Sequence, residues 1–128
     1  MRKINHKKLY RLMYQVDKVL RQSGIEYWIS FGTLLGCVRH GGIIPWDDDL
    51  DIAMMDSAFA KLNSKETRRR LKRANLKLYD SSDDSADYTW GISFIGKDWP
   101  FVDVYPMKKR GQYIGYVSDD IQEIESKC

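Results

Sequence analysis

Four aspartates fall within five consecutive positions near the middle of this 128-residue sequence, in the segment 47–51. Carboxylates gathered this closely repel one another, so the cluster indicates a compensating cation. Asp49 and Asp51 alternate with Leu50 and Ile52, which predicts a strand over 49–54 with both acids on one face, about 7 Å apart. The alternative is an acidic turn exposed to solvent at the end of a strand.

The type of ligand in this cluster favours a hard divalent cation. Carboxylate oxygens suit Mg²⁺ or Mn²⁺, and Mg²⁺ usually leaves several coordination positions to water and substrate phosphate. A calcium loop is excluded, because Ile52 stands where that loop needs glycine and Ala58 where it needs a bidentate glutamate. Asp49 and Asp51 therefore predict an open Mg²⁺ site, with Mn²⁺ as the second option.

A further acid, Asp103, lies in the apolar stretch 101–105, which is typical of a strand. A charge in such surroundings needs a partner. We favour a role for Asp103 as a third metal ligand or as the general base of the same site. The alternative is a single salt bridge to a basic residue such as Arg39.

A glycine turn between two predicted elements offers a place for phosphate. Gly32 and Thr33 follow a predicted strand over 26–30 and precede a short apolar segment, 34–38, that favours helix. Glycine lets a phosphate approach the backbone, and a helix N-terminus presents free N–H groups. We expect Gly32 and Thr33 to bind substrate, and Trp46, beside the acids, to stack on a base or sugar.

The elements that must position these residues follow from hydrophobic periodicity. An amphipathic helix is predicted over 5–23, and one or two helices over 56–74 with a break near 63–64. A turn rich in Asp and Ser is predicted over 80–87. The pattern predicts an α+β fold, a mixed sheet with helices packed on one side; its remaining strands are expected at 76–79, 88–95, 100–105 and, as an edge strand, 112–117.

Length and composition limit the classes of protein to which this chain can belong. The length predicts one domain over 1–128, with a loosely ordered tail at 118–128. A net charge of +3 does not indicate nucleic-acid binding. The two cysteines, Cys37 and Cys128, cannot form a disulfide framework, which favours reduced thiols and a cytoplasmic location. No apolar run approaches the roughly 20 residues of a membrane span.

Two blocks of this sequence resemble the LicD and fukutin-related family. They are Tyr27-Trp28-Ile29-Ser30-Phe31-Gly32-Thr33-Leu34-Leu35-Gly36-Cys37-Val38-Arg39-His40 and Ile43-Ile44-Pro45-Trp46-Asp47-Asp48-Asp49-Leu50-Asp51-Ile52, and Phe101 to Pro106 is similar to that family's later acidic strand. The resemblance covers roughly positions 9 to 107.

The resemblance implies a nucleotidyltransferase-type fold and Mg²⁺-dependent transfer of a phosphorylated alcohol, such as phosphocholine or ribitol phosphate. The implied donor is a CDP-alcohol and the implied acceptor a glycan. The resemblance assigns metal binding and catalysis to Asp49, Asp51 and Asp103. It also implies that Gly32 and Thr33 bind the donor phosphate and that Asp47 makes supporting contacts. Arg39 matches a basic position that would clamp phosphate in a bidentate manner.

Two other functions fit the same residues. A glycosyltransferase also uses an Asp-x-Asp pair, although such domains need a larger nucleotide-binding half than this chain supplies. A metal- or nucleotide-binding module that has lost turnover is the second alternative, because members of the family are usually about twice this length or longer.

Overall fold

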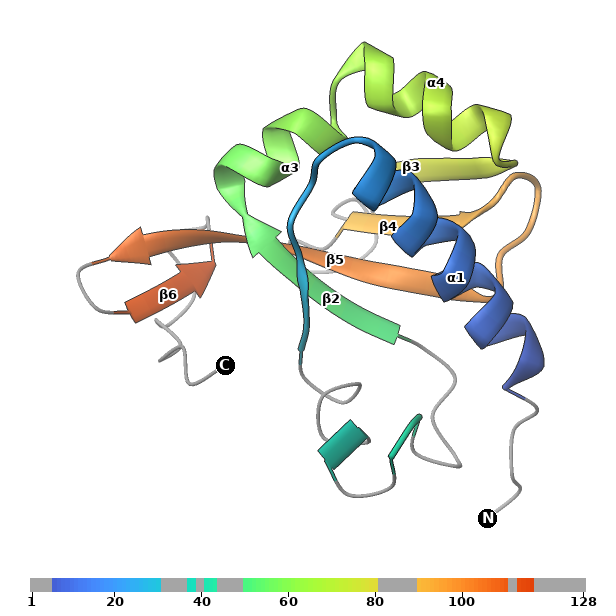
Figure 1. Cartoon of the computed structure of the whole chain (residues 1–128), viewed down its shortest axis with the longest axis horizontal. Coiled ribbons are helices and arrows are strands. Elements are labelled where there is room, and N and C mark those ends of the chain that lie inside the picture. The colour runs from blue at the N-terminus through green and yellow to red at the C-terminus, as the bar shows by residue number, and fades with distance from the viewer. Residues whose placement is uncertain are drawn as a thin grey trace.

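The computed structural model describes residues 6–30, 37–38, 41–43, 50–80, 90–110 and 113–116 (Figure 1). Within these ranges the chain folds into a mixed sheet with helices packed against it, so the predicted α+β class is confirmed. The elements are α1 Lys7–Gln22, β1 Trp28–Ile29, β2 Leu50–Met55, α3 Asp56–Leu62, α4 Lys65–Arg73, β3 Leu76–Asp80, β4 Trp90–Phe94, β5 Phe101–Arg110 and β6 Tyr113–Tyr116.

The strands follow the order β1-β2-β5-β4-β3, and β6 pairs with the far end of β5. β2 and β5 run parallel, whereas the other neighbouring strands run antiparallel. In Figure 1 the second half of β5 leaves the main body of the sheet and carries β6 with it. β5 is therefore the strand that connects all parts of the sheet.

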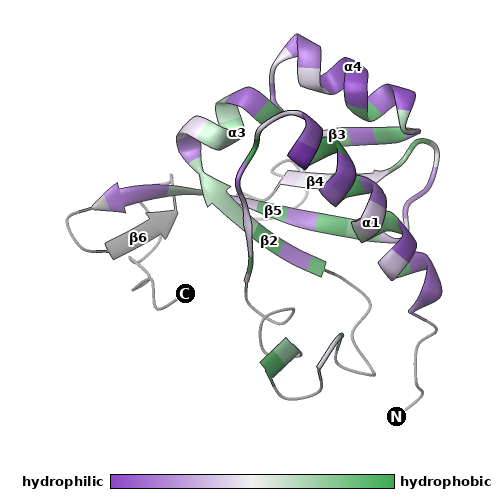
Figure 2. Cartoon of the chain, viewed as in Figure 1, coloured by the Kyte–Doolittle hydropathy of each residue, from purple (hydrophilic) through white to green (hydrophobic). Residues whose placement is uncertain are grey.

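One face of the sheet forms the hydrophobic core. Leu78, Ile92, Val102 and Leu50 lie side by side across four strands in the pairing register, and each is at most 2% exposed. The described helices pack on this face, since their buried residues belong to the same cluster. Figure 2 shows mostly hydrophilic residues along α1 and α4, and alternating hydropathy along β2 and β5. The helix residues in this cluster include Leu9, Leu12, Val16, Val19 and Leu20 of α1, Leu62 of α3 and Leu71 of α4.

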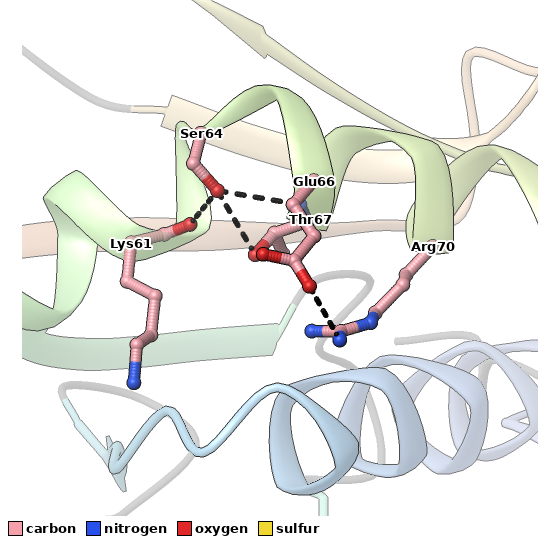
Figure 3. Close-up of polar contacts among 5 residues, drawn as sticks. All are labelled: Lys61, Ser64, Glu66, Thr67 and Arg70. Carbon is pink, nitrogen blue, oxygen red and sulfur yellow. Dashed lines mark hydrogen bonds and ion pairs between the residues drawn. The ribbon is translucent and has the colours of Figure 1, made fainter.

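The predicted break in the second helical region is real, and it separates α3 from α4 at Asn63 and Ser64. The Ser64 hydroxyl accepts a hydrogen bond from the N–H of Thr67 at 3.3 Å and donates one to the Lys61 carbonyl oxygen at 2.7 Å (Figure 3). One serine thus satisfies a free donor at the start of α4 and an acceptor at the end of α3.

The fifth strand is longer than the sequence predicted. We expected it to end at position 105, but β5 continues to Arg110 with Pro106 inside it. Pro106 faces Met54 on the β2 side, and on the other edge it lies after the last β4 pair and before the first β6 pair. A proline is tolerated there because no neighbour on that edge needs its missing N–H.

Other predictions are met in part. Residues 37–38 of the predicted 34–38 helix are helical. Of the predicted turn at 80–87, Asp80 instead ends β3, where it pairs with Trp90; residues 81–87 and the tail at 118–128 lie outside the described residues. Cys37 is exposed and free of any disulfide. No helix in the described ranges has the length and apolar character needed to cross a membrane.

Replacing Ser64 by alanine should lower the free energy of unfolding by about 1 kcal/mol, because the first turn of α4 loses its cap. Chemical denaturation followed by circular dichroism measures the change. Ser57→Ala, at an exposed position of α3, is the control and should change stability by less than about 0.5 kcal/mol. Equal stability of the two variants would contradict the capping role.

Candidate functional site

Two of the predicted acids lie side by side in the centre of the sheet. Asp51 of β2 and Asp103 of β5 are register partners in the parallel pair. Neighbouring strands lie about 4.8 Å apart and register partners project from the same face. Because Leu50 and Ile52 point into the core, both carboxylates lie on the opposite face, away from the described helices.

The surroundings of Asp51 are polar. Asp51 is buried, with 7% of its surface exposed, and its Oδ1 accepts a 3.4 Å hydrogen bond from the Tyr105 hydroxyl. Its carbonyl oxygen accepts the N–H of Ser30 at 3.0 Å. This bond continues the register of β1 with β2 by one residue, which places Ser30 opposite Asp51 on the same face.

The side chain of Ser30 is itself unusual. Its hydroxyl is buried and has no hydrogen-bond partner among the described residues. A buried hydroxyl without a partner costs free energy, and such groups often serve a function. Ser30 therefore offers a donor next to Asp51 for a substrate oxygen.

A tyrosine from the edge strand lies next to Asp103. Gly91 of β4 is the register partner of both Asp103 and Tyr79. A Cβ added at Gly91 would lie 2.4 Å from Cζ and 2.5 Å from the hydroxyl oxygen of Tyr79, so the phenol ring lies across Gly91. Burial raises the pKa of Tyr79, and the negative charges of Asp103 and Asp98 raise it further. The Tyr79 hydroxyl consequently stays protonated at neutral pH.

These contacts define a row of residues across the face of the sheet opposite the described helices, in the order Ser30, Asp51, Asp103, Gly91 and Tyr79. We call it the carboxylate row. It runs through every strand from β1 to β3 at one level. The row can hold a cation at its acidic centre and donate hydrogen bonds from both ends.

The remaining predicted site residues cannot be placed. The residues Gly32, Thr33, Arg39, Trp46, Asp47 and Asp49 lie outside the described residues. They belong to the connection between Ser30, which lies opposite Asp51, and Leu50, which precedes Asp51 in β2; of this connection only residues 37–38 and 41–43 are described. Among described residues no group of three or more His, Cys, Asp or Glu is close enough to hold a metal. The three-acid set with Asp49 stays a prediction.

Sequence reasoning missed four members of the site. Tyr105 follows Asp103 by two positions and so shares its face, which the strand period could have revealed. A glycine inside a strand such as Gly91 often marks close approach of another group. Nothing in the sequence singles out Ser30 or Tyr79.

A cavity of about 650 Å³ lies at the other end of β2, lined by Met55 and the end of α1. Of its two acids, Asp17 and Glu26, Asp17 is already engaged: the hydrogen bond from the Tyr27 hydroxyl and the nearby Arg21 lower the pKa of Asp17. This cavity is remote from the carboxylate row, and we assign it no part in the chemistry.

A family model described as "LicD/FKTN/FKRP, nucleotidyltransferase domain" matches residues 24–125. The chain therefore belongs to this family, as the two sequence blocks predicted. Its carboxylate row lies within the matched region.

Similar curated proteins share shorter stretches with the chain. An uncharacterized protein of Rickettsia prowazekii, RP689, is 60% identical over 47 residues, 37% of this chain and 18% of that protein. Mouse ribitol 5-phosphate transferase FKRP is 53% identical over 36 residues, 28% of this chain and 7% of that one. The lipopolysaccharide cholinephosphotransferase LicD of Haemophilus influenzae is 57% identical over 30 residues, 23% and 11% of the two chains.

The matched segments span less than a fifth of each of these relatives. Among solved structures, that of ANT(2")-Ia in complex with adenylyl-2"-tobramycin has a TM-score of 0.56 at 12% identity, over 86% of this chain and 56% of that one. This likeness concerns the fold alone. With the family match, it confirms a nucleotidyltransferase-type fold.

Substitution of Gly91 by alanine should lower the free energy of unfolding by about 1–3 kcal/mol, because the new methyl group overlaps the Tyr79 ring. In a Tyr79→Ala background the same change should be neutral or stabilising, since alanine suits a strand better than glycine. Denaturation of the four proteins gives the coupling energy. A penalty of equal size in both backgrounds would show that the ring does not lie across Gly91.

Proposed function

We propose that this chain transfers a phosphorylated alcohol, of the ribitol-phosphate or phosphocholine type, from a CDP-linked donor to a hydroxyl group of a glycan. Membership of a family whose named relatives are ribitol-phosphate and choline-phosphate transferases supports transfer of a phosphorylated alcohol. The observation that carries the proposal is the pairing of Asp51 with Asp103 on the face of the central strands opposite the described helices.

The residues present fit a divalent cation. Two carboxylates on adjacent strands at one level supply oxygen ligands of the kind that Mg²⁺ or Mn²⁺ prefers. Asp51 and Asp103 would hold the ion together with Asp49, the neighbour of Asp51 by strand alternation. When bound, the ion would offset negative charge on the phosphates of the donor.

The chain's own residues then account for the remaining steps. The acceptor hydroxyl transfers its proton to the carboxylate of Asp103. The oxygen of that hydroxyl forms a bond to the phosphorus that carries the alcohol. The anhydride P–O bond breaks, and CMP leaves with the electron pair of that bond. No water is consumed, and the proton on Asp103 passes to solvent after CMP has left.

Other residues of the site would bind and orient the donor. Ser30, Gly32 and Thr33 supply donors to phosphate oxygens at the β1 side of the acids, and Arg39 adds a bidentate contact. Trp46 stacks on the base, and Asp47 supports the metal ligands. Most of the rate enhancement would come from positioning and electrostatics, as is usual for phosphoryl transfer.

Asp51→Asn and Asp103→Asn should each reduce CMP release from a CDP-alcohol by at least about 100-fold, the usual minimum contribution of a general acid or base. Mg²⁺ binding, measured by calorimetry, should weaken in both variants, and the fold should persist because asparagine is isosteric. Glu26→Gln removes an exposed carboxylate that precedes β1 and lines the cavity at the other end of β2, and this variant should behave as wild type.

Product analysis distinguishes the proposed reaction from the two alternative functions, glycosyl transfer and ligand binding without turnover. Release of CMP with phosphate on the acceptor supports the proposal, whereas release of a nucleoside diphosphate would identify a glycosyltransferase. Binding of Mg²⁺ and CDP without consumption of any CDP-alcohol would identify a binding module. Wild-type turnover in either aspartate variant would overturn the assignment of the site.

A further inference from the structure

A second cavity adjoins the carboxylate row on the face of the sheet opposite the described helices. It has a volume of about 490 Å³ and lies between β3, the start of β5 and the turn that joins β4 to β5. Neither the predicted metal site nor the predicted donor site includes it. The residues lining it include Lys77, Tyr79, Ser93, Lys97, Asp98 and Phe101.

The register fixes where this cavity lies relative to the acids. Lys77, Ser93 and Phe101 are register partners across β3, β4 and β5, and they form the row next to the carboxylate row. Rows on one face are separated by two residues along a strand, about 7 Å. Tyr79 belongs to both, because its ring lines the cavity and lies across Gly91 beside Asp103.

The order of the strands separates this cavity from the donor side. The segments 31–36 and 44–49 join β1 and β2, whereas the cavity lies on β3 and β4. Asp103 stands on β5 between the two. An in-line displacement needs the attacking and leaving oxygens on opposite sides of the phosphorus. The cavity lies on the other side of Asp103 from β1 and β2, the strands to which the predicted donor residues connect, and this is where an attacking hydroxyl should approach.

The chemistry of the lining indicates what would bind. The rings of Tyr79 and Phe101 present apolar faces of the kind that sugars stack on, and the buried Ser93 offers a hydroxyl. Lys77 and Lys97 bring two positive charges at neutral pH, against one negative charge from Asp98. The lining therefore favours a saccharide that carries a negative group.

We propose that this cavity is the acceptor subsite, and that it binds a sugar carrying a phosphate or carboxylate close to the hydroxyl that is modified. This rests on the proposed function, since the acceptor is defined only by that reaction. Lys77 and Lys97 bind the negative group, Tyr79 and Phe101 contact the ring, and the free hydroxyl faces Asp103.

Binding can be measured without catalysis. Glucose 6-phosphate, glucuronate, glucose and inorganic phosphate are titrated into the full chain, and backbone NMR shifts report the residues affected. We expect the two anionic sugars to bind more tightly than glucose or phosphate, with the largest shifts in β3 and in residues 96–98. Glucose binding as tightly as the anionic sugars, or phosphate alone binding as tightly, would overturn the proposal.

Charge variants test the role of the lysines. Lys77→Ala and Lys97→Ala should each weaken binding of the anionic sugars about tenfold, the usual effect of losing one hydrogen bond to a charged group. Lys77→Arg should retain most of the affinity. Lys18→Ala removes the same charge from an exposed position of α1 and should bind as wild type. Equal affinities in all four variants would overturn the proposal.

Comparing the KM for the acceptor with the rate of CMP release to water distinguishes failure of this proposal from failure of the proposed function. In the lysine variants the KM for an anionic acceptor should rise about tenfold, whereas slow CMP release to water, which needs no acceptor, should not change. If the wild type binds anionic sugars through the lysines but never releases CMP, the proposed reaction is wrong and the binding site stands. If CMP is released and the lysine variants transfer with unchanged KM, the acceptor subsite is wrong.

Discussion

The parallel pairing of β2 with β5 is the constraint on which the site depends. It places Asp51 beside Asp103, although two like charges at neighbouring positions oppose each other. The hydrophobic partners on the opposite face hold the register: Ile52 pairs with Val104, and each is fully buried. A slip of one residue would carry the acids into the core and the core residues into solvent. The core therefore stabilises the arrangement that the acids by themselves would disfavour.

This constraint divides the sheet into two faces with different tasks. The face under the helices contains the buried aliphatic residues, and its rows are continuous from β3 to β2. The opposite face has the carboxylate row and, next to it, the row formed by Lys77, Ser93 and Phe101. Function can thus vary on one face while the packing that fixes the register is kept on the other.

Local patterns predicted the elements well, because periodicity is a local property. The alternation of Asp51 with Leu50 and Ile52 correctly predicted which side chains enter the core. The weak apolar stripe over 56–74 left one or two helices open, and the structure has two, separated at Asn63 and Ser64. The adjacency of Asp51 and Asp103 is different. It depends on which strands pair and in what register; the charge of Asp103 in an apolar strand suggested a partner, but no sequence pattern gives the register that places it beside Asp51.

The contacts that complete the site lay beyond any sequence pattern. Tyr79 meets Gly91 through the pairing of β3 with β4, and the length of β5 beyond Pro106 depends on β6 replacing β4 as its neighbour. Both are consequences of tertiary pairing. A proline at position 106 reads as the end of a strand until the neighbours on each edge are known.

Each acid of the pair has a phenol close by, and this choice of residue matters for the chemistry. The Tyr105 hydroxyl donates to Asp51, and the Tyr79 ring lies over the glycine next to Asp103. A phenol can orient a carboxylate without neutralising it, whereas a guanidinium would compete with a divalent cation for the same charge. Because burial and the nearby acids raise the pKa of Tyr79, its hydroxyl stays neutral at the pH where the acids are ionised. Tyr105 thus orients Asp51 through a neutral hydrogen bond, and Tyr79 contributes an uncharged hydroxyl group beside Asp103.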